Sequence, residues 1–209
     1  SVFARNSTNG SLTFIDVLRD GDVQGLLTID GLDGAESVAV SPDGAHVYAA
    51  GFNDGAVAVF ARTPATGQLT YVETHKDLSL GGTASGLLGA SSIAMSADGG
   101  SLYVASFTSD AVAHFQRDTV VASPTYGALT FQSAVIDNAP GVNGLDGATS
   151  VRLSPNGDHL YVASSVEKAI AVFSRDGGTG ALTWVEAKFD GQGGANGLDG
   201  VNGLALSVD

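Results

Sequence analysis

The sequence predicts an all-β protein of short antiparallel strands, and three observations support this fold class. The 29 glycines are spread along the chain at turn positions rather than gathered in a linker. Stretches such as residues 46–52 and 56–62 alternate small and large residues, as the pleat of a strand requires. A block that begins at residue 31 returns at residues 86, 144 and 197, which lie 55, 58 and 53 residues apart. Internal repetition of this kind indicates a repeat architecture.

Each repeat opens with Gly-Leu-Asp-Gly or Gly-Leu-Leu-Gly and continues with four expected strands. A turn of the type Pro-Asp-Gly, Ala-Asp-Gly or Pro-Asn-Gly separates the first two strands, because Asp or Asn caps the bend and Gly adopts a positive φ. The first strands are expected at 37–41, 92–96, 150–154 and 203–207, the second at 46–52, 101–107 and 159–165, the third at 56–62, 111–117 and 169–175, and the fourth at 69–73, 129–133 and 182–186.

The two ends of the chain carry incomplete repeats within a single domain that covers residues 1–209. SVFAR at residue 1 and LTFID at residue 12 match the third and fourth strands, and the sequence ends just after a first strand. The repeat units are therefore 1–30, 31–85, 86–143, 144–196 and 197–209.

This pattern amounts to 15 strands, one short of four complete four-stranded units. Short antiparallel strands in fours, without a helical period, are typical of the blades of a β-propeller. A linear β-solenoid is the competing architecture, although its coils would not need four hairpin turns in each repeat. An incomplete blade leaves an open sheet edge. We therefore expect a second chain or further sequence to complete a larger ring.

The composition argues against several classes of partner. The chain has 22 acidic and 9 basic residues and a formal charge of -13, so it would repel nucleic acid and anionic membranes. Without cysteine it has no disulfide and no thiolate metal site. No stretch approaches the roughly 18 apolar residues that span a bilayer. The first ten residues do not have the layout of a signal peptide.

The run SPDGAHVYAAGFNDGAVAVFARTPATGQLTYVE, with partners at 96–133 and 154–186, carries a family resemblance. It resembles the repeat of lactonase-type, phosphogluconolactonase-like seven-bladed β-propellers, close to the YVTN repeats of bacterial surface proteins. The resemblance covers nearly the whole chain. It implies a seven-bladed ring and, for the characterised members, lactone hydrolysis, but fold alone does not assign function.

A second resemblance concerns a metal. The chain is similar to gluconolactonase and regucalcin-like propellers, in which a carboxylate and an amide at the start of inner strands hold a divalent cation on the axis. Glu36 and Asn202 stand at equivalent repeat positions, each just ahead of a first strand. The resemblance thus implies that they bind Ca²⁺ or another divalent cation. Ser91 and Thr149 stand at the other two equivalents, so the alternative is a channel lined by ordinary polar residues.

Other side chains have both a catalytic and a structural interpretation. His114 replaces a valine of the third strand and would be a general base or a core histidine. Arg152 replaces an inner-strand alanine and would bind a lactone oxygen or pair with an acid such as Glu36. An arginine ends every third strand, and we expect each to pair across its hairpin with the residue that ends the fourth strand. His46 and His159 are expected to be exposed beside turns.

Three hypotheses about function follow. The first is a non-catalytic propeller module of a bacterial-type extracellular or periplasmic protein, which binds a small molecule or a protein through loops at one face. The second is a lactone hydrolase with an axial metal at Glu36 and Asn202, assisted by Arg152 or His114. The third is a structural repeat of a large adhesin. Convergence of the unusual residues at one mouth of the channel would favour the enzyme.

Overall fold

A computed structural model describes residues 1–208 and confirms an all-β fold of antiparallel four-stranded sheets. Three complete sheets follow one another along the chain, and in each of them consecutive strands are neighbours. Blade 1 contains β5 (Ala35–Val40), β6 (His46–Gly51), β7 (Ala56–Arg62) and β8 (Leu69–Lys76). Blade 2 contains β9 (Ala90–Met95), β10 (Ser101–Ser106), β11 (Ala111–Arg117) and β12 (Leu129–Ile136). Blade 3 contains β13 (Ala148–Leu153), β14 (His159–Ser164), β15 (Ala169–Arg175) and β16 (Leu182–Phe189).

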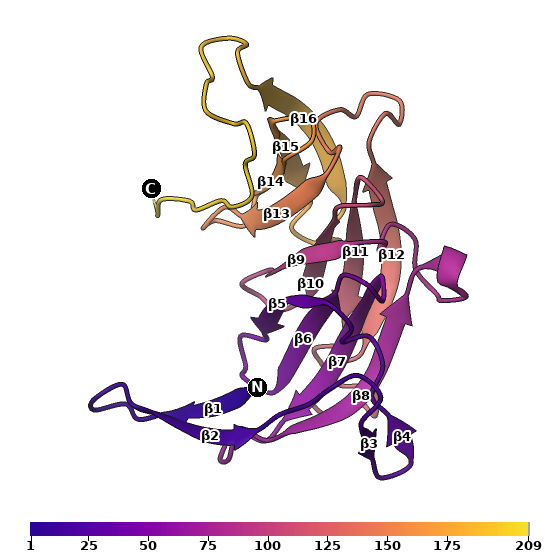
Figure 1. Cartoon of the computed structure of the whole chain (residues 1–209), viewed down its shortest axis with the longest axis vertical. Helices are drawn as coiled ribbons and strands as arrows, with labels where there is room; N and C mark the ends of the chain where they lie inside the picture. Colours follow the sequence, from indigo (N-terminus) through magenta and orange to yellow (C-terminus); the bar gives the residue numbers. More distant parts are fainter. Residues whose placement is uncertain (209) are drawn as a thin grey trace.

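The three blades are arranged as part of a propeller ring. Figure 1 shows β5, β9 and β13 on the inner side of the arc, with β8 and β12 on its outer side. The inner strands of neighbouring blades contact one another. Across residues 1–208 the structure has no helix long and apolar enough to cross a membrane, and the only helical segment there is the turn η1 (Leu78–Leu80).

An N-terminal hairpin precedes blade 1, as the repeat predicts. It pairs β1 (Val2–Arg5) with β2 (Leu12–Asp16). Phe3 lies opposite Phe14 after a register shift, and Phe60 lies opposite Tyr71 after the same shift in blade 1. The hairpin therefore consists of the third and fourth strands of a further blade.

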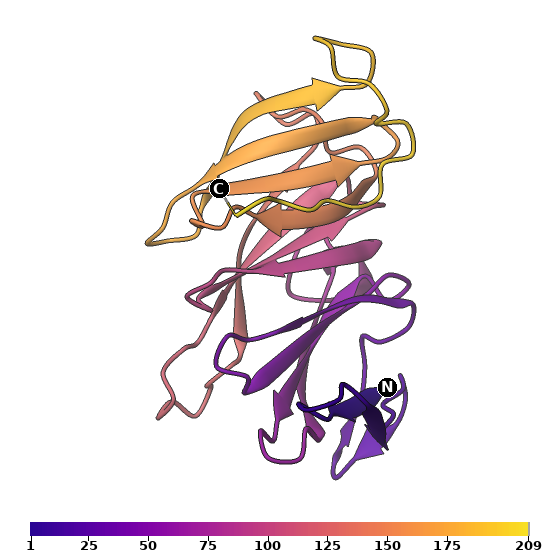
Figure 2. The same cartoon turned by 90° about the vertical axis from the view of Figure 1, so that its left-hand side faces the viewer.

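Two details differ from the sequence prediction. A small hairpin of β3 (Val23–Gln24) and β4 (Leu27–Thr28) lies in the loop before blade 1. The expected strand at 203–207 does not form, because a first strand pairs only with the second strand of its own blade, and residues 1–208 offer this segment no such partner. Figure 2 shows this C-terminal segment beside β13, where the Thr149 hydroxyl donates to the Val201 carbonyl over 3.2 Å.

The turns between strands form as their chemistry predicts. In blade 1 the amide of Gly44 donates to the carbonyl of Ser41 over 2.8 Å, and the Asp43 carboxylate accepts from the amide of Ala45 over 2.9 Å. Gly55 adopts a positive φ of 55° in the next turn. Asp110 and Lys168 stand at the equivalent positions of blades 2 and 3, with φ of 49° and 54°. Non-glycine side chains in this region carry backbone strain.

The core is a series of apolar clusters between blades. One cluster joins blade 1 to blade 2, and a second joins blade 2 to blade 3. Each cluster contains a fully buried tyrosine from a second strand. Tyr48 belongs to the cluster between blades 1 and 2, and Tyr103 belongs to the cluster between blades 2 and 3. The phenylalanines near the end of each third strand are also buried and pack within the blades: Phe60, Phe115 and Phe173.

The prediction of charge pairs across the hairpin is wrong. Antiparallel pairing places the last residue of the third strand opposite the first residue of the fourth, so Arg62 lies opposite Leu69, and Glu73 lies opposite Val59. Arg117 and Arg175 instead reach the preceding blade. Arg117 donates from Nε to the Tyr48 hydroxyl over 2.7 Å and contacts Asp43 through Nη2 over 2.7 Å.

The blade 2 to blade 3 boundary repeats this arrangement. Arg175 Nε donates to the Tyr103 hydroxyl over 2.8 Å. Each tyrosine also donates to a buried glycine carbonyl of the next blade, Tyr48 to Gly127 over 2.8 Å and Tyr103 to Gly180 over 2.6 Å. An Arg–Tyr–Gly contact therefore joins each pair of complete blades.

The expectation that His46 is exposed is also wrong. His46 is 4% exposed because Tyr126 of blade 2 packs edge-on against its ring at 4.8 Å, and the backbone of Gly127 lies over it. Burial, followed by the charge of Arg117, lowers the pKa of His46.

Candidate active site

A cavity of about 420 Å³ lies where the inner strands converge. The second residue of each inner strand lines it, together with Asn202 at the equivalent repeat position of the C-terminal segment, so Glu36, Ser91, Thr149 and Asn202 come together from four successive repeats. The remaining lining residues are Phe52 and Phe107. The structure thus brings Glu36 and Asn202, the two metal-ligating candidates, to one site.

β-Bulges aim these side chains into the cavity. Glu36 is the unpaired residue between Ala35, which faces Gly51, and Ser37, which faces Ala50. Ser91 and Thr149 are the unpaired residues of the same register shift in β9 and β13. A bulge turns one side chain out of the pleat and is frequent beside active sites. The repeated bulge therefore gives the cavity one polar side chain from each complete blade.

The two hydroxyl groups of the cavity are engaged in joining the blades. Ser91 Oγ lies 3.0 Å from the carbonyl of Ala105 in its own blade and 3.0 Å from that of Ala148 in the next. Thr149 makes the same pair of contacts with Ala163 and Val201. Because a hydroxyl has one proton, these groups have none left to donate to a ligand.

Glu36 and Asn202 differ from the hydroxyl residues. Within residues 1–208, neither the Glu36 carboxylate nor the Asn202 amide makes a hydrogen bond, and both residues are exposed. They are therefore the two polar groups of the cavity that remain available for a bound molecule.

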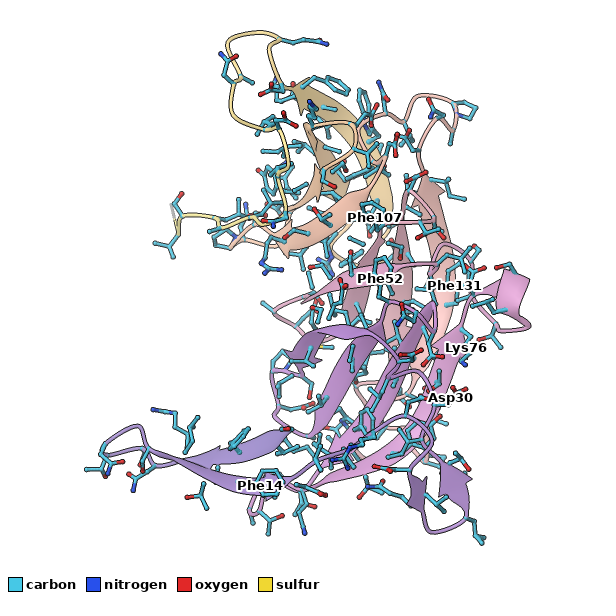
Figure 3. All side chains as sticks on the ribbon, viewed as in Figure 1. Phe14, Asp30, Phe52, Lys76, Phe107 and Phe131 are labelled. Carbon is cyan, nitrogen blue, oxygen red and sulfur yellow. The ribbon has the colours of Figure 1, made fainter. Side chains whose placement is uncertain are left out.

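The aromatic side chains form an apolar wall. Phe52 follows β6 and Phe107 follows β10, and their ring centroids lie 6.2 Å apart at an interplanar angle of 41°. Figure 3 shows the two rings on successive repeats. The sequence analysis does not identify them, because it places them as the last residues of the second strands at 46–52 and 101–107. The signal was available, since Ser165 replaces phenylalanine at the same position of blade 3.

The donor set does not fit a resident calcium ion. Glu36 is the one charged side chain among the residues that line the cavity. Calcium takes about six to eight oxygen ligands and binds more tightly as carboxylates are added. The hydroxyl groups of Ser91 and Thr149 are directed at carbonyl groups instead. The implied divalent cation at Glu36 and Asn202 therefore lacks sufficient ligands among the described residues.

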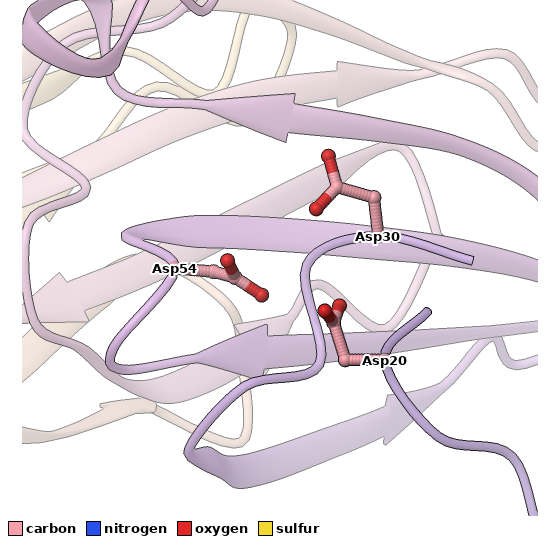
Figure 4. Close-up of side chains that lie close together, drawn as sticks. All are labelled: Asp20, Asp30 and Asp54. Carbon is pink, nitrogen blue, oxygen red and sulfur yellow. The ribbon is translucent and has the colours of Figure 1, made fainter. Parts of the chain in front are cut away.

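A group of three carboxylates lies elsewhere, in the loops around blade 1. Figure 4 shows Asp20, Asp30 and Asp54 close together, and their oxygens lie within 4.8 Å of one another. Lys76 pairs with two of these carboxylates, because its Nζ lies 2.7 Å from Asp30 and 3.2 Å from Asp54. Asp20 also accepts from the amide of Leu32 over 3.2 Å. This cluster fastens loops together.

The two further catalytic candidates lie outside the cavity. His114 is 2% exposed, stacks on Tyr103 at 4.9 Å, and leaves Nε2 without a hydrogen bond among the described residues. Burial, followed by the charge of Arg175, lowers the pKa of His114 to about 4. A neutral histidine in this environment is a packing residue rather than a general base that faces the cavity.

Arg152 is exposed on β13. Its Nη1 donates to the Val151 carbonyl over 2.7 Å and lies 3.5 Å from Ser92 Oγ. It does not pair with Glu36 in the structure, and it does not line the cavity.

Comparison with known families identifies the chain. Residues 1–125 match the family described as "Lactonase, 7-bladed beta-propeller". The chain belongs to this lactonase family. The match covers the N-terminal hairpin, blade 1 and most of blade 2, which include Glu36, Ser91 and both phenylalanines of the cavity. No curated protein matches the chain at a significant level.

Solved structures share the fold of this lactonase-family propeller. A Pseudomonas aeruginosa periplasmic gluconolactonase is 25% identical, with a TM-score of 0.62 over 77% of this chain and 40% of its own. A Bacteroides uniformis protein proposed to be a 6-phosphogluconolactonase is 21% identical, with a TM-score of 0.63 over 90% of this chain and 47% of its own. A Lactobacillus plantarum protein is 22% identical, with a TM-score of 0.66 over 88% and 47%. The chain thus spans about half the length of these proteins.

Proposed function

We propose that the protein is a lactone hydrolase and that the cavity at the inner strands is part of its active site. The observation that carries the proposal is the convergence of an unpaired carboxylate, an unpaired amide and an aromatic wall on one cavity. The family and the name of the Pseudomonas aeruginosa relative support this chemistry over a non-catalytic scaffold.

The residues suggest a division of roles. Glu36 acts as the general base: it accepts a proton from water as the water oxygen attacks the lactone carbonyl carbon. Asn202 donates from its amide to the carbonyl oxygen, on which negative charge develops. The ring C–O bond then breaks, and the leaving alkoxide takes back the proton that Glu36 holds, which gives the hydroxy acid and restores the Glu36 carboxylate. Phe52 and Phe107 pack against the C–H face of the lactone ring.

Glu36→Gln tests the assignment, because glutamine keeps the shape and cannot accept the proton. Hydrolysis of glucono-δ-lactone is followed by acid release against the spontaneous rate. We expect Glu36→Gln to lower kcat/KM by about 10²–10⁴-fold, the usual contribution of a general base. Glu167→Gln, a carboxylate change outside the cavity, is the control. Equal rates for Glu36→Gln and the unmodified protein would exclude Glu36 as the base.

Metal removal provides an independent test. Because the cavity does not have the ligands of a calcium site, we expect a chelator to leave the rate unchanged. A rate that falls on chelation and returns with Ca²⁺ would instead support the axial metal that the gluconolactonase-like propellers suggest.

A non-catalytic binding module is the second candidate. It is favoured by the hydroxyl groups of Ser91 and Thr149, which are engaged with carbonyl groups rather than free to act on a ligand. Saturable binding of the lactone without acceleration of its hydrolysis would support this function.

A further inference from the structure

The fourth strand of blade 1 carries a carboxylate and an imidazole side by side. Glu73 and His75 lie two residues apart on β8, so both side chains project from the same face of the sheet. His75 Nε2 lies 3.2 Å from Glu73 Oε1. Blade 2 has Val135 at the position of His75, and blade 3 has Lys188. Blade 1 is therefore the one complete blade with a histidine at this place.

A loop specific to blade 1 brings a hydroxyl group to this histidine. It follows β8 on the outer side of the arc in Figure 1. The carboxylate that begins it, Asp77, accepts from a backbone amide ten residues further on, whereas the equivalent bonds in the later loops span eight. Gly82 lets the loop fold back, because a Cβ there would collide with the carbonyl of Lys76. The amide of Thr83 donates to that carbonyl over 3.1 Å, and its hydroxyl lies 3.1 Å from Nδ1 of His75.

The hydrogen bonds determine where the protons of these three groups lie. The Glu73 carboxylate also accepts from the amide of Leu129 over 2.9 Å. Burial raises the pKa of Glu73, but the bonds from His75 and Leu129 outweigh burial, and the pKa is lowered. An ionised carboxylate only accepts, so Nε2 of His75 carries the proton and Nδ1 is left as an acceptor. The Thr83 hydroxyl therefore donates to Nδ1, in the order of nucleophile, base and orienting group that activates a hydroxyl.

The histidine is held in place while the hydroxyl remains accessible. The side chain of His75 is 13% exposed and packs on Phe115 of blade 2, with ring centroids 5.4 Å apart. Thr83 is exposed, and its hydroxyl has no other hydrogen bond among residues 1–208. Every group of this arrangement lies on blade 1, on blade 2 or in the loop between them, so it is separate from the inner cavity.

The contact between His75 and Thr83 is not needed to fasten the loop. After each complete blade an aspartate accepts from a leucine amide of the loop, over 2.9 Å, 3.0 Å and 2.9 Å. The loops after blades 2 and 3 keep this bond without a histidine beside them. His75 and Thr83 therefore add a reactive arrangement to a loop that Asp77 already holds.

We propose that Thr83 is an acyl-accepting nucleophile for small activated esters, with His75 as its general base and Glu73 as a positioning residue. The Thr83 oxygen forms a bond to the ester carbonyl carbon as its proton passes to Nδ1 of His75. The bond between that carbon and the leaving oxygen then breaks, and the leaving group takes the proton from His75. Because Thr83 lines none of the described cavities, selection depends on a small acyl group and a good leaving group.

The test follows acetyl transfer from p-nitrophenyl acetate to the intact chain, with the acetylated residues located by peptide mass spectrometry. We expect Thr83 to be acetylated at least about 100-fold faster than Thr125, the low end of the effect of a general base. Thr125 is the internal control, because it is exposed and its hydroxyl donates to the Asp118 carboxylate over 2.8 Å, without a histidine partner. This comparison within one molecule does not depend on the folding of any variant.

Variants separate the three roles. Thr83→Ser should keep acetylation at this position, Thr83→Val should abolish it, and Thr125→Val should leave the acetylation of Thr83 unchanged. His75→Gln should lower the rate at Thr83 by about 100-fold or more. Glu73→Gln removes the charge that stabilises the imidazolium formed in the step, so the rate should fall and the midpoint of its pH profile should move to lower pH. A merely structural role of Glu73 would leave that midpoint in place.

Two results would overturn the proposal. One is acetylation of Thr83 in the unmodified protein no faster than that of Thr125. The other is an equal rate at Thr83 in the unmodified protein and in a folded His75→Gln variant, which would show that the histidine does not act as the base.

Discussion

Removal of one hydroxyl group, in Tyr103→Phe, measures the strength of a blade boundary. Tyr103 is fully buried, donates to the Gly180 carbonyl over 2.6 Å and accepts from Arg175 Nε over 2.8 Å. Phenylalanine keeps the ring and its stacking on His114 but leaves both partners without this hydrogen bond. An unsatisfied buried group costs about 1–3 kcal/mol, with larger values for charged groups. Because Arg175 keeps other contacts, to Gly157 and Ser101, we expect a loss of about 2–3 kcal/mol in the free energy of unfolding.

Tyr161→Phe is the matched control within the same chain. Tyr161 occupies the same position in blade 3, is half-buried, and has no hydrogen bond among the described residues. Its substitution should change stability by less than about 0.5 kcal/mol.

Urea denaturation can be followed through Trp184, the single tryptophan, which packs on the cluster between blades 2 and 3. The two variants are compared at equal m-value, so that the change in midpoint reports stability. Equal destabilisation by Tyr103→Phe and Tyr161→Phe would refute the claim that the contact between blades, rather than packing within a blade, gives the tyrosine its role.

Two further predictions concern stability. In the folded protein the pKa of His114 is lowered to about 4. Between about pH 6.5 and pH 4 the unfolded chain therefore binds one more proton at this residue than the folded chain does. The free energy of unfolding should fall as the pH falls through that range, by up to about 3 kcal/mol. His114→Val, which introduces the residue found in blades 1 and 3, should remove that part of the pH dependence in denaturation curves measured from pH 7 to pH 4; unchanged slopes would contradict it. Lys168 has a positive φ of 54°, which glycine adopts without strain. Lys168→Gly should therefore increase the free energy of unfolding by about 0.5–1 kcal/mol and raise the thermal midpoint, whereas Ser165→Gly, beside the same turn, should not.

Much of the fold could be predicted from the sequence because the determinants of each blade are local. The turn after Ser41 and the alternation in residues 56–62 act within one hairpin, and the repeats make the pattern visible three times. The meeting of Glu36 with Asn202 followed from their equal repeat positions. Equivalent positions in a ring of blades face the same axis.

The missed features depend on contacts between blades or on local departures from regular pairing. Arg117 bonds to Tyr48, which lies 69 residues earlier, and no local pattern signals that distance. His46 is buried for the same reason, by Tyr126 of the next blade. The bulge at Glu36 breaks the alternation on which strand reasoning depends. The strand expected at 203–207 has the right composition but no partner strand among residues 1–208.

The bulges at Glu36, Ser91 and Thr149 also determine how this cavity can change during evolution. Each blade contributes one bulged side chain, so a point mutation in a single repeat alters one wall and leaves the others in place. A serine or threonine there gains a bond to the next blade, while Glu36 gives up that bond and presents a reactive group instead. At each of these positions the side chain therefore either bonds to the next blade or remains available to a ligand in the cavity. Ligand specificity can diversify one repeat at a time only as far as the remaining hydroxyl links still hold the blades together.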